Sequence, residues 1–375
     1  METSRREGGE AGNRRDDIIL TLNDIRMEKV LKKEEWLMGR SLQELKQVAE
    51  EIGMKAFAGR QMADWIYKKR VAGIDGMTNL SLEARRRLGE AGYVVGRREP
   101  CEVQVSVDGT KKYLFRTLGG GYIEAVYIPD GERATLCVSS QAGCRMGCRF
   151  CMTGRQGFRH HLTAGEIVNQ VVAIPEAERL TNIVFMGMGE PMDNVGEVLR
   201  AVEILTAEWG LGWSPTRITV STVGVIPAME RLLRETKVHL AVSLHDPFGE
   251  ERGRLMPVER RYEIEEVVGA LRKQDFAHQR RLSFEYIVFK GVNDSKRHVE
   301  GLARLPKGVP CRINLIRFHA IPESSLRGVS PEEMKRINGA LNAAGILTTT
   351  RGSRGEDILA ACGLLSTVAQ EEAGA

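Results

Sequence analysis

Six short β-rich segments alternate with helical segments from residue 134 onwards, and this alternation constrains the fold more than any other feature of the chain. The segments are 134–140, 181–187, 217–222, 237–245, 281–289 and 312–318. They are apolar and rich in β-branched residues, as parallel strands buried on both faces are. Strands that alternate with helices form βα units. The sequence therefore predicts an α/β fold, either doubly wound or a partial barrel.

Local signals mark several helix starts. Ser41 precedes a helical segment that carries Glu44 three places on, and Thr163 stands in the same relation to Glu166, so both pairs predict capping boxes. Ser330 before Pro331 predicts a further N-terminus. Near the end of the chain, the run 346–352 reads as a seventh strand, and we expect a last short helix over 356–366.

The first third of the chain has a different pattern of predicted elements. Residues 30–92 read as helical, and residues 101–129 read as a hairpin whose turn is the Asp-Gly-Thr at 108–110. The expected organisation is a disordered arm over 1–30, a basic helical and hairpin accessory domain over 36–115, a barrel over 130–367 and a tail over 368–375.

Charge is unevenly distributed along the chain. The net charge is +4 overall, but residues 51–116 hold 13 Lys and Arg against 8 Asp and Glu, a balance of +5. Such a bias is typical either of solvated helix faces or of a surface that binds a polyanion. No apolar run approaches the roughly 18 residues of a membrane helix, and the N-terminus has no apolar signal segment. We therefore expect a cytoplasmic protein without a membrane partner.

Three of the seven cysteines lie close together in a C-x3-C-x2-C pattern: Cys144, Cys148 and Cys151. An odd number of cysteines in a reducing compartment argues against a disulfide framework. A structural zinc ion would need a fourth ligand, which His160 or His161 could supply. A [4Fe–4S] cluster normally takes four cysteines, so three would leave one iron open to a small molecule. Inert core thiols are a third possibility, which the neighbouring glycines and arginines disfavour.

Other unusual residues follow the remaining predicted strands. The carboxyl ends of parallel strands meet at one edge of the sheet, where ligands bind in both doubly wound and barrel folds. The segment GMGEP (187–191) follows the second strand, Ser221 ends the third, residues 243–245 end the fourth and His319 follows the sixth. GMGEP is not a dinucleotide-binding G-x-G-x-x-G, since the next glycine is Gly196.

Together these motifs resemble a known family. The cysteine pattern after the first strand resembles the radical S-adenosylmethionine (SAM) superfamily, whose fold is a partial (βα)6 barrel. The segments 134–158, 187–194, 221–224, 241–245, 255–262, 291–295 and 358–365 are similar to the RlmN/Cfr family of RNA methyltransferases. The resemblance covers roughly residues 40–367.

The resemblance implies a role for each site residue. It implies that Cys144, Cys148 and Cys151 hold a [4Fe–4S] cluster. The positions that match the SAM site are Gly189, Glu190, Ser221, Ser243, Leu244, His245 and His319, the last being an asparagine in some members.

The resemblance also implies three catalytic residues. Cys362 would accept a methyl group from SAM, Cys137 would resolve the RNA adduct by forming a Cys137–Cys362 disulfide, and Glu124 would accept a proton. Cys101 and Cys311 match nothing in the family and are expected to pack.

The implied reaction is methylation of adenosine C2 in 23S rRNA near the peptidyl-transferase centre and in tRNA 3′ of the anticodon. A monomer with a flavodoxin-type electron donor is expected. The target base would be flipped out, and Lys68, Lys69, Arg85, Arg86 and Arg87 are candidates for RNA contact. Three alternatives stay open: a Cfr-type C8 methyltransferase, a non-catalytic RNA-binding protein with a structural metal, and a radical SAM enzyme acting on a small molecule.

Overall fold

The computed structural model describes residues 34–276, 281–322 and 324–367. The arm expected over 1–30 and the tail expected over 368–375 lie outside these residues. None of the helices in the described ranges is long and apolar enough to cross a membrane.

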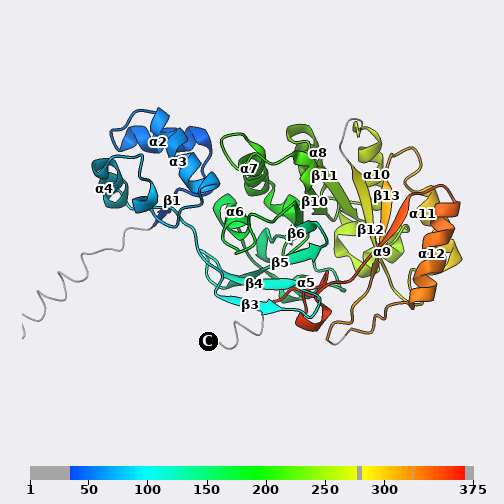
Figure 1. Ribbon diagram of the computed structural model, residues 1–375. Coiled ribbons are helices and arrows are strands. Elements are labelled where there is room, and N and C mark those ends of the chain that lie inside the picture. Colours follow the sequence, from blue (N-terminus) through cyan, green and yellow to red (C-terminus); the bar gives the residue numbers. More distant parts are fainter. Residues whose placement is uncertain (1–33, 277–280, 323, 368–375) are drawn as a thin grey trace, which may run out of the picture.

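A small helical unit opens the described chain (Figure 1). Its helices are α2 (Leu42–Glu51), α3 (Phe57–Ala63) and α4 (Leu82–Glu90), with a π-helical turn η1 (Asp64–Lys68) and a 3-10 turn η2 (Ile74–Gly76). The two-stranded parallel pair β1 (Glu35–Trp36) and β2 (Tyr93–Val94) closes it. The predicted capping box is present, because Ser41 accepts from the Glu44 N–H while the Glu44 carboxylate accepts from the Ser41 N–H.

One ten-stranded sheet forms the body of the protein, in the order β14-β13-β12-β11-β10-β9-β6-β5-β4-β3. Its parallel strands are β6 (Arg133–Cys137), β9 (Asn182–Phe185), β10 (Ile218–Thr222), β11 (His239–Ser243), β12 (Leu282–Val288), β13 (Arg312–Arg317) and β14 (Thr348–Arg351). β14 and β3 are its two edges, so the sheet is an open barrel. The predicted partial barrel is confirmed.

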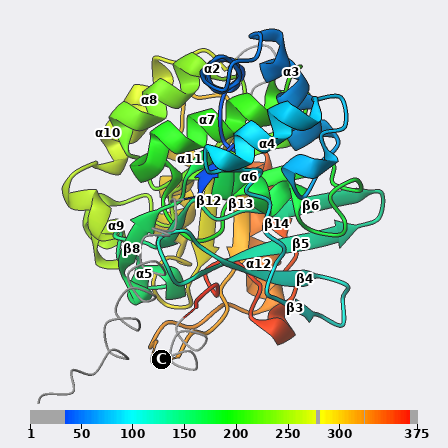
Figure 2. The same cartoon turned by 90° about the vertical axis from the view of Figure 1, so that its left-hand side faces the viewer.

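The expected hairpin continues this sheet. The strands β3 (Glu102–Val105), β4 (Lys111–Arg116) and β5 (Tyr122–Asp130) pair antiparallel with one another, and β5 pairs antiparallel with β6. Figure 2 shows them as a curved flap below the helices. The sheet therefore runs through residue 115, where the sequence placed a boundary.

Helices cover the outer face of the parallel strands (Figures 1 and 2). They are α6 (Ala164–Val172), α7 (Val195–Thr206), α8 (Ile226–Glu235), α9 (Gly249–Leu255), α10 (Ile264–Arg272), α11 (Lys296–Arg304) and α12 (Pro331–Ala343). The caps predicted at Thr163 and Ser330 are present. Apolar side chains from these helices pack on strands such as β12, all of whose residues are buried.

The prediction of a helix over residues 356–366 is wrong. The structure has only a 3-10 turn at Glu356–Ile358, flanked by Gly355 and Leu359 in left-handed conformations. The following residues bond instead to distant elements: the Met152 N–H donates to the Gly363 carbonyl at 2.8 Å. Cys362 therefore lies on an irregular segment, which tertiary hydrogen bonds hold in place.

Candidate active site

The three clustered cysteines lie on a tight loop at the carboxyl side of β6. The loop runs from β7 (Gln141–Gly143) to α5 (Met152–Gln156), and β7 pairs antiparallel with β8 (Phe158–His161) beneath it. Gly143 has φ +73°, and a Cβ there would lie 1.8 Å from the Gly157 carbonyl oxygen, so this turn requires glycine. The Cys144 N–H donates to that carbonyl at 2.9 Å, which fixes the start of the loop.

The donor set of this loop fits an iron–sulfur cluster. Cys144 and Cys148 are buried and Cys151 is partly buried. Burial, together with the neighbouring thiolates, raises the pKa of all three thiols, that of Cys144 to about 12. A cationic metal group would offset that cost, because it stabilises deprotonated thiols. Among the described residues, the three sulfur atoms are not all within 4.8 Å of one another. A single tetrahedral zinc ion with bonds of about 2.3 Å would draw them closer, to roughly 3.8 Å.

A fully buried arginine, Arg252, lies beneath this loop, and no sequence pattern singled it out. Arg252 pairs with the buried Glu259 and donates to the carbonyl oxygens of Val223, Ser243 and Leu244 at 2.8, 2.9 and 3.0 Å. It therefore ties together the ends of β10 and β11. Its proximity acts to lower the pKa of Cys148, against the larger effect of burial.

The glycine-rich segment after β9 brings Glu190 to the same edge of the sheet. Gly189 has φ +98°, and a Cβ there would lie 2.5 Å from Cβ of Gln141. The Glu190 carboxylate accepts from the N–H groups of Met192 and Val223, both at 3.0 Å. Burial raises its pKa to about 7 despite these hydrogen bonds. A carboxylate has about four acceptor positions, so Glu190 keeps capacity to bind an ammonium group.

His245 lies two residues after the end of β11, in a constrained, buried position. Its φ is +54°, and Nδ1 accepts from the Ile287 N–H at 3.0 Å. Burial lowers its pKa to about 3. The ring is therefore neutral, and its proton lies on Nε2. The edge-on contact with the Phe150 ring, at 4.8 Å between centroids, links it to the cysteine loop.

The other residues expected at the SAM site differ in how deeply their side chains are buried. Ser221 and Ser243 are half-buried at the ends of β10 and β11. Leu244 is fully buried in the apolar core, so its side chain contributes packing. His319 follows β13, where Nε2 lies 2.7 Å from Oγ of Ser353.

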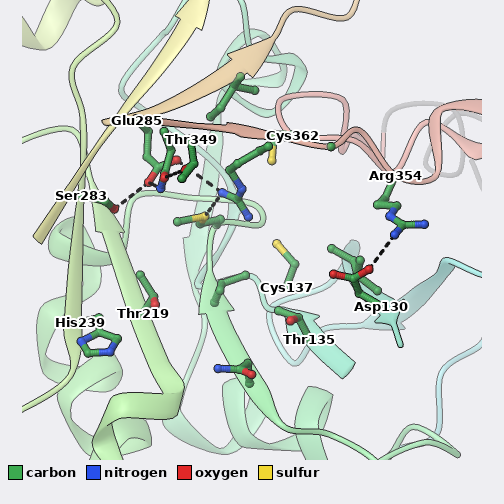
Figure 3. Close-up of a pocket in the computed structure, with 18 of the residues that line it drawn as sticks. Asp130, Thr135, Cys137, Thr219, His239, Ser283, Glu285, Thr349, Arg354 and Cys362 are labelled. Carbon is green, nitrogen blue, oxygen red and sulfur yellow. Dashed lines mark hydrogen bonds and ion pairs between the residues drawn. The ribbon is translucent and has the colours of Figure 1, made fainter. Parts of the chain in front are cut away.

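A polar cavity of about 1290 Å³ fills the inside of the barrel, and two distant cysteines line it. Cys137 is at the end of β6 and Cys362 is on the irregular C-terminal segment, and in Figure 3 their sulfur atoms face the same space. Both are free thiols. Burial and the neighbouring Cys362 raise the pKa of Cys137 to about 12. His319 lines this cavity too.

Glu124, on β5, is not among the residues that line this cavity. Its carboxylate is 1% exposed, accepts from the Ser366 N–H at 2.9 Å and pairs with Lys112 at 3.0 Å. Burial raises its pKa, while Lys112 acts to lower it. The structure thus connects Glu124 to the segment that carries Cys362.

Two charged residues inside the barrel were missed by the sequence reasoning. Glu285, on β12, accepts from Ser283 at 2.8 Å and from Asn314 at 2.7 Å. Arg351, on β14, lies 3.5 Å from Glu285 and 3.1 Å from Sδ of Met186. A glutamate in the middle of a mostly apolar strand was the available signal, because acidic residues are almost never fully buried unless they are paired.

The basic residues expected to contact RNA are mostly engaged with local partners. Arg86 and Arg87 pair with Glu83, and Arg85 donates to the Asp75 carbonyl at 2.7 Å. Lys69 lies over the Trp65 ring. Lys68 is exposed and lines a second hollow, of about 630 Å³, that also contains Lys46 and Arg60.

Comparison with known proteins agrees with this geometry. The Radical SAM superfamily model matches residues 138–302, and the Ribosomal RNA large subunit methyltransferase N-terminal domain model matches residues 36–94. The crystal structure of a radical SAM methyltransferase from Sphaerobacter thermophilus superposes with a TM-score of 0.84 at 42% identity, over 88% of this chain and 99% of that one.

Curated relatives match over nearly their whole length. The probable dual-specificity RNA methyltransferase RlmN of Phocaeicola vulgatus is 56% identical over 336 residues, which is 90% of this chain and 96% of the relative. The dual-specificity RNA methyltransferase RlmN of Syntrophus aciditrophicus is 42% identical, over 88% of this chain and 96% of the relative. The chain therefore belongs to the RlmN family of the radical SAM superfamily.

Proposed function

We propose that this protein methylates C2 of adenosine in both 23S rRNA and tRNA, through a methyl group first carried on Cys362. The observation that carries the proposal is the pair Cys137 and Cys362, which come from distant parts of the chain to face one cavity. C2 is an electron-poor amidine carbon without a lone pair, so it cannot attack the methyl group of SAM directly. Addition of a carbon radical to C2 avoids that difficulty.

Cys362 is the methyl carrier. Its thiolate attacks the methyl carbon of SAM, an S–CH₃ bond forms, and S-adenosylhomocysteine leaves. Its exposure at the cavity suits this role, because the thiol must meet first SAM and then the RNA base. When bound at Cys144, Cys148 and Cys151, a [4Fe–4S] cluster supplies the electron for reductive cleavage of a second SAM. Glu190, His245 and His319 orient that SAM.

Cys137 releases the product. Cleavage of the second SAM would give a 5′-deoxyadenosyl radical, which takes a hydrogen atom from the methyl group on Cys362 and leaves as 5′-deoxyadenosine. The methylene radical adds to C2. Glu124 then takes the C2 proton, and the one electron that the adduct loses would return to the oxidised cluster. The C–S bond to Cys362 then breaks as the S–S bond with Cys137 forms, and the released carbon takes up a proton as the methyl group. The disulfide is reduced before the next cycle, which suits a cytoplasmic enzyme.

The helical unit that precedes the sheet docks the RNA. Phosphate contacts from basic side chains would supply most of the affinity, and Lys46, Arg60 and Lys68 around the second hollow are the groups best placed for them. We further propose a monomer that receives its electrons from a flavodoxin-type donor.

The test is anaerobic reconstitution with iron and sulfide, followed by incubation with SAM, a reductant and unmodified rRNA or tRNA fragments. Mass spectrometry of the digested nucleosides should find 2-methyladenosine with the wild type and none with Cys362→Ala. Cys311→Ala is the matched control, because Cys311 lies outside the cavity lining, and it should keep full activity. Methylation at C8 would assign a Cfr-type reaction instead. A protein that binds zinc in place of iron and methylates neither carbon would overturn the proposal.

A further inference from the structure

Three ionisable side chains that are separate from the three clustered cysteines converge beside the loop that follows β11. Asp246 follows the strand, Glu251 lies on α9 and His298 lies on α11. One ligand atom from each lies within 4.8 Å of the others. His298 Nε2 is 2.7 Å from Oε2 of Glu251 and 3.6 Å from Oδ2 of Asp246. Asp246 is fully buried and His298 nearly so.

Each of these side chains is oriented by a second contact. Oδ1 of Asp246 accepts from the Phe248 N–H at 2.9 Å, and Arg297 binds Oε1 of Glu251. Nδ1 of His298 is 2.6 Å from Oγ of Ser295. Histidines that bind metals characteristically use their other ring nitrogen in this way, which fixes the tautomer and leaves Nε2 available. The three remaining atoms therefore all point at one place.

Oδ2 of Asp246 is a second, independent observation that points to a cation-binding site. This atom is buried and has no hydrogen-bond partner among the described residues. An unpartnered carboxylate oxygen in the interior costs free energy, and burial raises the pKa of Asp246 to about 6. The nearest group, Nε2 of His298, is already within hydrogen-bond distance of Glu251.

We propose that Asp246, Glu251 and His298 bind one divalent transition-metal ion, with zinc as the best fit. Two carboxylates and an imidazole are ligands that zinc accepts, and water would fill the fourth position. Zinc bonds of about 2.0–2.2 Å place tetrahedral ligand atoms roughly 3.3–3.5 Å apart. The His298–Asp246 separation already matches, and the His298–Glu251 pair has to open by less than about 1 Å.

The ion has a clear structural consequence. Asp246 directly follows His245, α9 lies over the carboxyl ends of β10 and β11, and α11 is a separate helix. A metal ion bound to Asp246, Glu251 and His298 joins α9 and α11 to the segment that carries Ser243, Leu244 and His245, and so stabilises that segment. The ion thus stabilises the position of residues expected at the SAM site and takes no part in the radical chemistry. The alternative without a metal is a protonated His298 whose Nε2–H group interacts with both carboxylates.

The experiment is metal analysis of the cluster-loaded full-length protein after zinc exposure and desalting. The wild type should retain one zinc per chain more than Asp246→Asn or His298→Gln, at unchanged iron content. Ser295→Ala should weaken zinc affinity roughly 10- to 100-fold, as loss of an outer-shell partner does, and the two ligand variants should weaken it more. Glu250→Gln is the matched control, because Glu250 is the exposed neighbour of Glu251 on α9.

Each outcome is decisive. Equal zinc in the wild type, Asp246→Asn and His298→Gln would overturn the inference in favour of the protonated His298. Zinc that is lost only on Cys144→Ala would place the metal in the cysteine loop and overturn it as well. Thermal unfolding with and without zinc guards against misfolded variants, since zinc should raise the melting temperature of Ser295→Ala less than that of the wild type. Because iron and zinc are counted separately, failure of the cluster to assemble would not be mistaken for failure of this site.

Discussion

The backbone N–H of Ser366 donates to the carboxylate of Glu124 across 2.9 Å, and this bond anchors the segment that carries Cys362 to strand β5. The same carboxylate pairs with Lys112. Glu124 therefore has two separable roles, as a tether for the C-terminal segment and as the proposed proton acceptor.

Glu124→Gln separates these roles. The amide oxygen still accepts from Ser366, so the tether is kept, but the amide cannot take a proton and methylation should fall by about 10²- to 10⁴-fold. Because the ion pair with the buried Lys112 is lost as well, the melting temperature should fall, but by less than in Glu124→Ala. The stalled reaction should accumulate a covalent RNA–protein adduct, which a denaturing gel with labelled RNA detects. Glu124→Ala removes both roles and should also lower the melting temperature. Full activity in Glu124→Gln would exclude Glu124 as the base.

Gly189 should tolerate no side chain. Gly189→Ala combines strain at φ +98° with a contact of 2.5 Å to Cβ of Gln141, which together cost about 2 kcal/mol or more. Displacing Gln141 also removes the acceptor of the Glu190 N–H, so SAM binding measured by calorimetry should weaken. Gly196→Ala, in open space at the start of α7, is the control and should be neutral or slightly stabilising. Equal melting temperatures for the two variants would contradict this account.

Local signals predicted the elements that local hydrogen bonds determine. The caps at Ser41 and Thr163 depend on a residue three positions away, and both formed as expected. The segment around Cys362 depends on distant partners instead. Met152 bonds to the Gly363 carbonyl, and Thr153 donates to the Leu365 carbonyl at 2.7 Å. Those contacts replace the helical bonds that the apolar pattern suggested.

The site shows the same division. The cysteine loop could be recognised from spacing, because all three cysteines lie within eight residues. The approach of Cys137 to Cys362 was implied only by resemblance, since no local pattern links them. Arg252 looked like an ordinary helix-surface charge, and its burial follows from the three carbonyl oxygens that two strand ends turn towards it.

Loss of Arg252 should be among the most damaging single changes outside the cysteines. Arg252→Met leaves Glu259 buried without its partner, which typically costs about 3–5 kcal/mol. Adding Glu259→Gln removes the uncompensated charge and should recover part of that loss. Arg254→Met, which breaks an exposed ion pair on the same helix, should cost less than about 1 kcal/mol. Urea unfolding of these variants tests the order, and similar losses at 252 and 254 would show that the buried network contributes little.

His245 should make the protein sensitive to acid. Its pKa in the folded protein is about 3, below the ordinary histidine value of 6.5, so the unfolded chain takes up a proton first as the pH falls. The stability from this group is complete above pH 6.5 and is lost as the pH falls towards 3. At pH 5 the loss is about 2 kcal/mol, from roughly 1.36 kcal/mol for each pH unit. In His245→Asn, the amide oxygen can still accept from Ile287 but does not titrate, so urea unfolding at pH 7 and pH 5 should show a smaller loss than in the wild type. An identical loss in both proteins would assign the acid sensitivity to other groups.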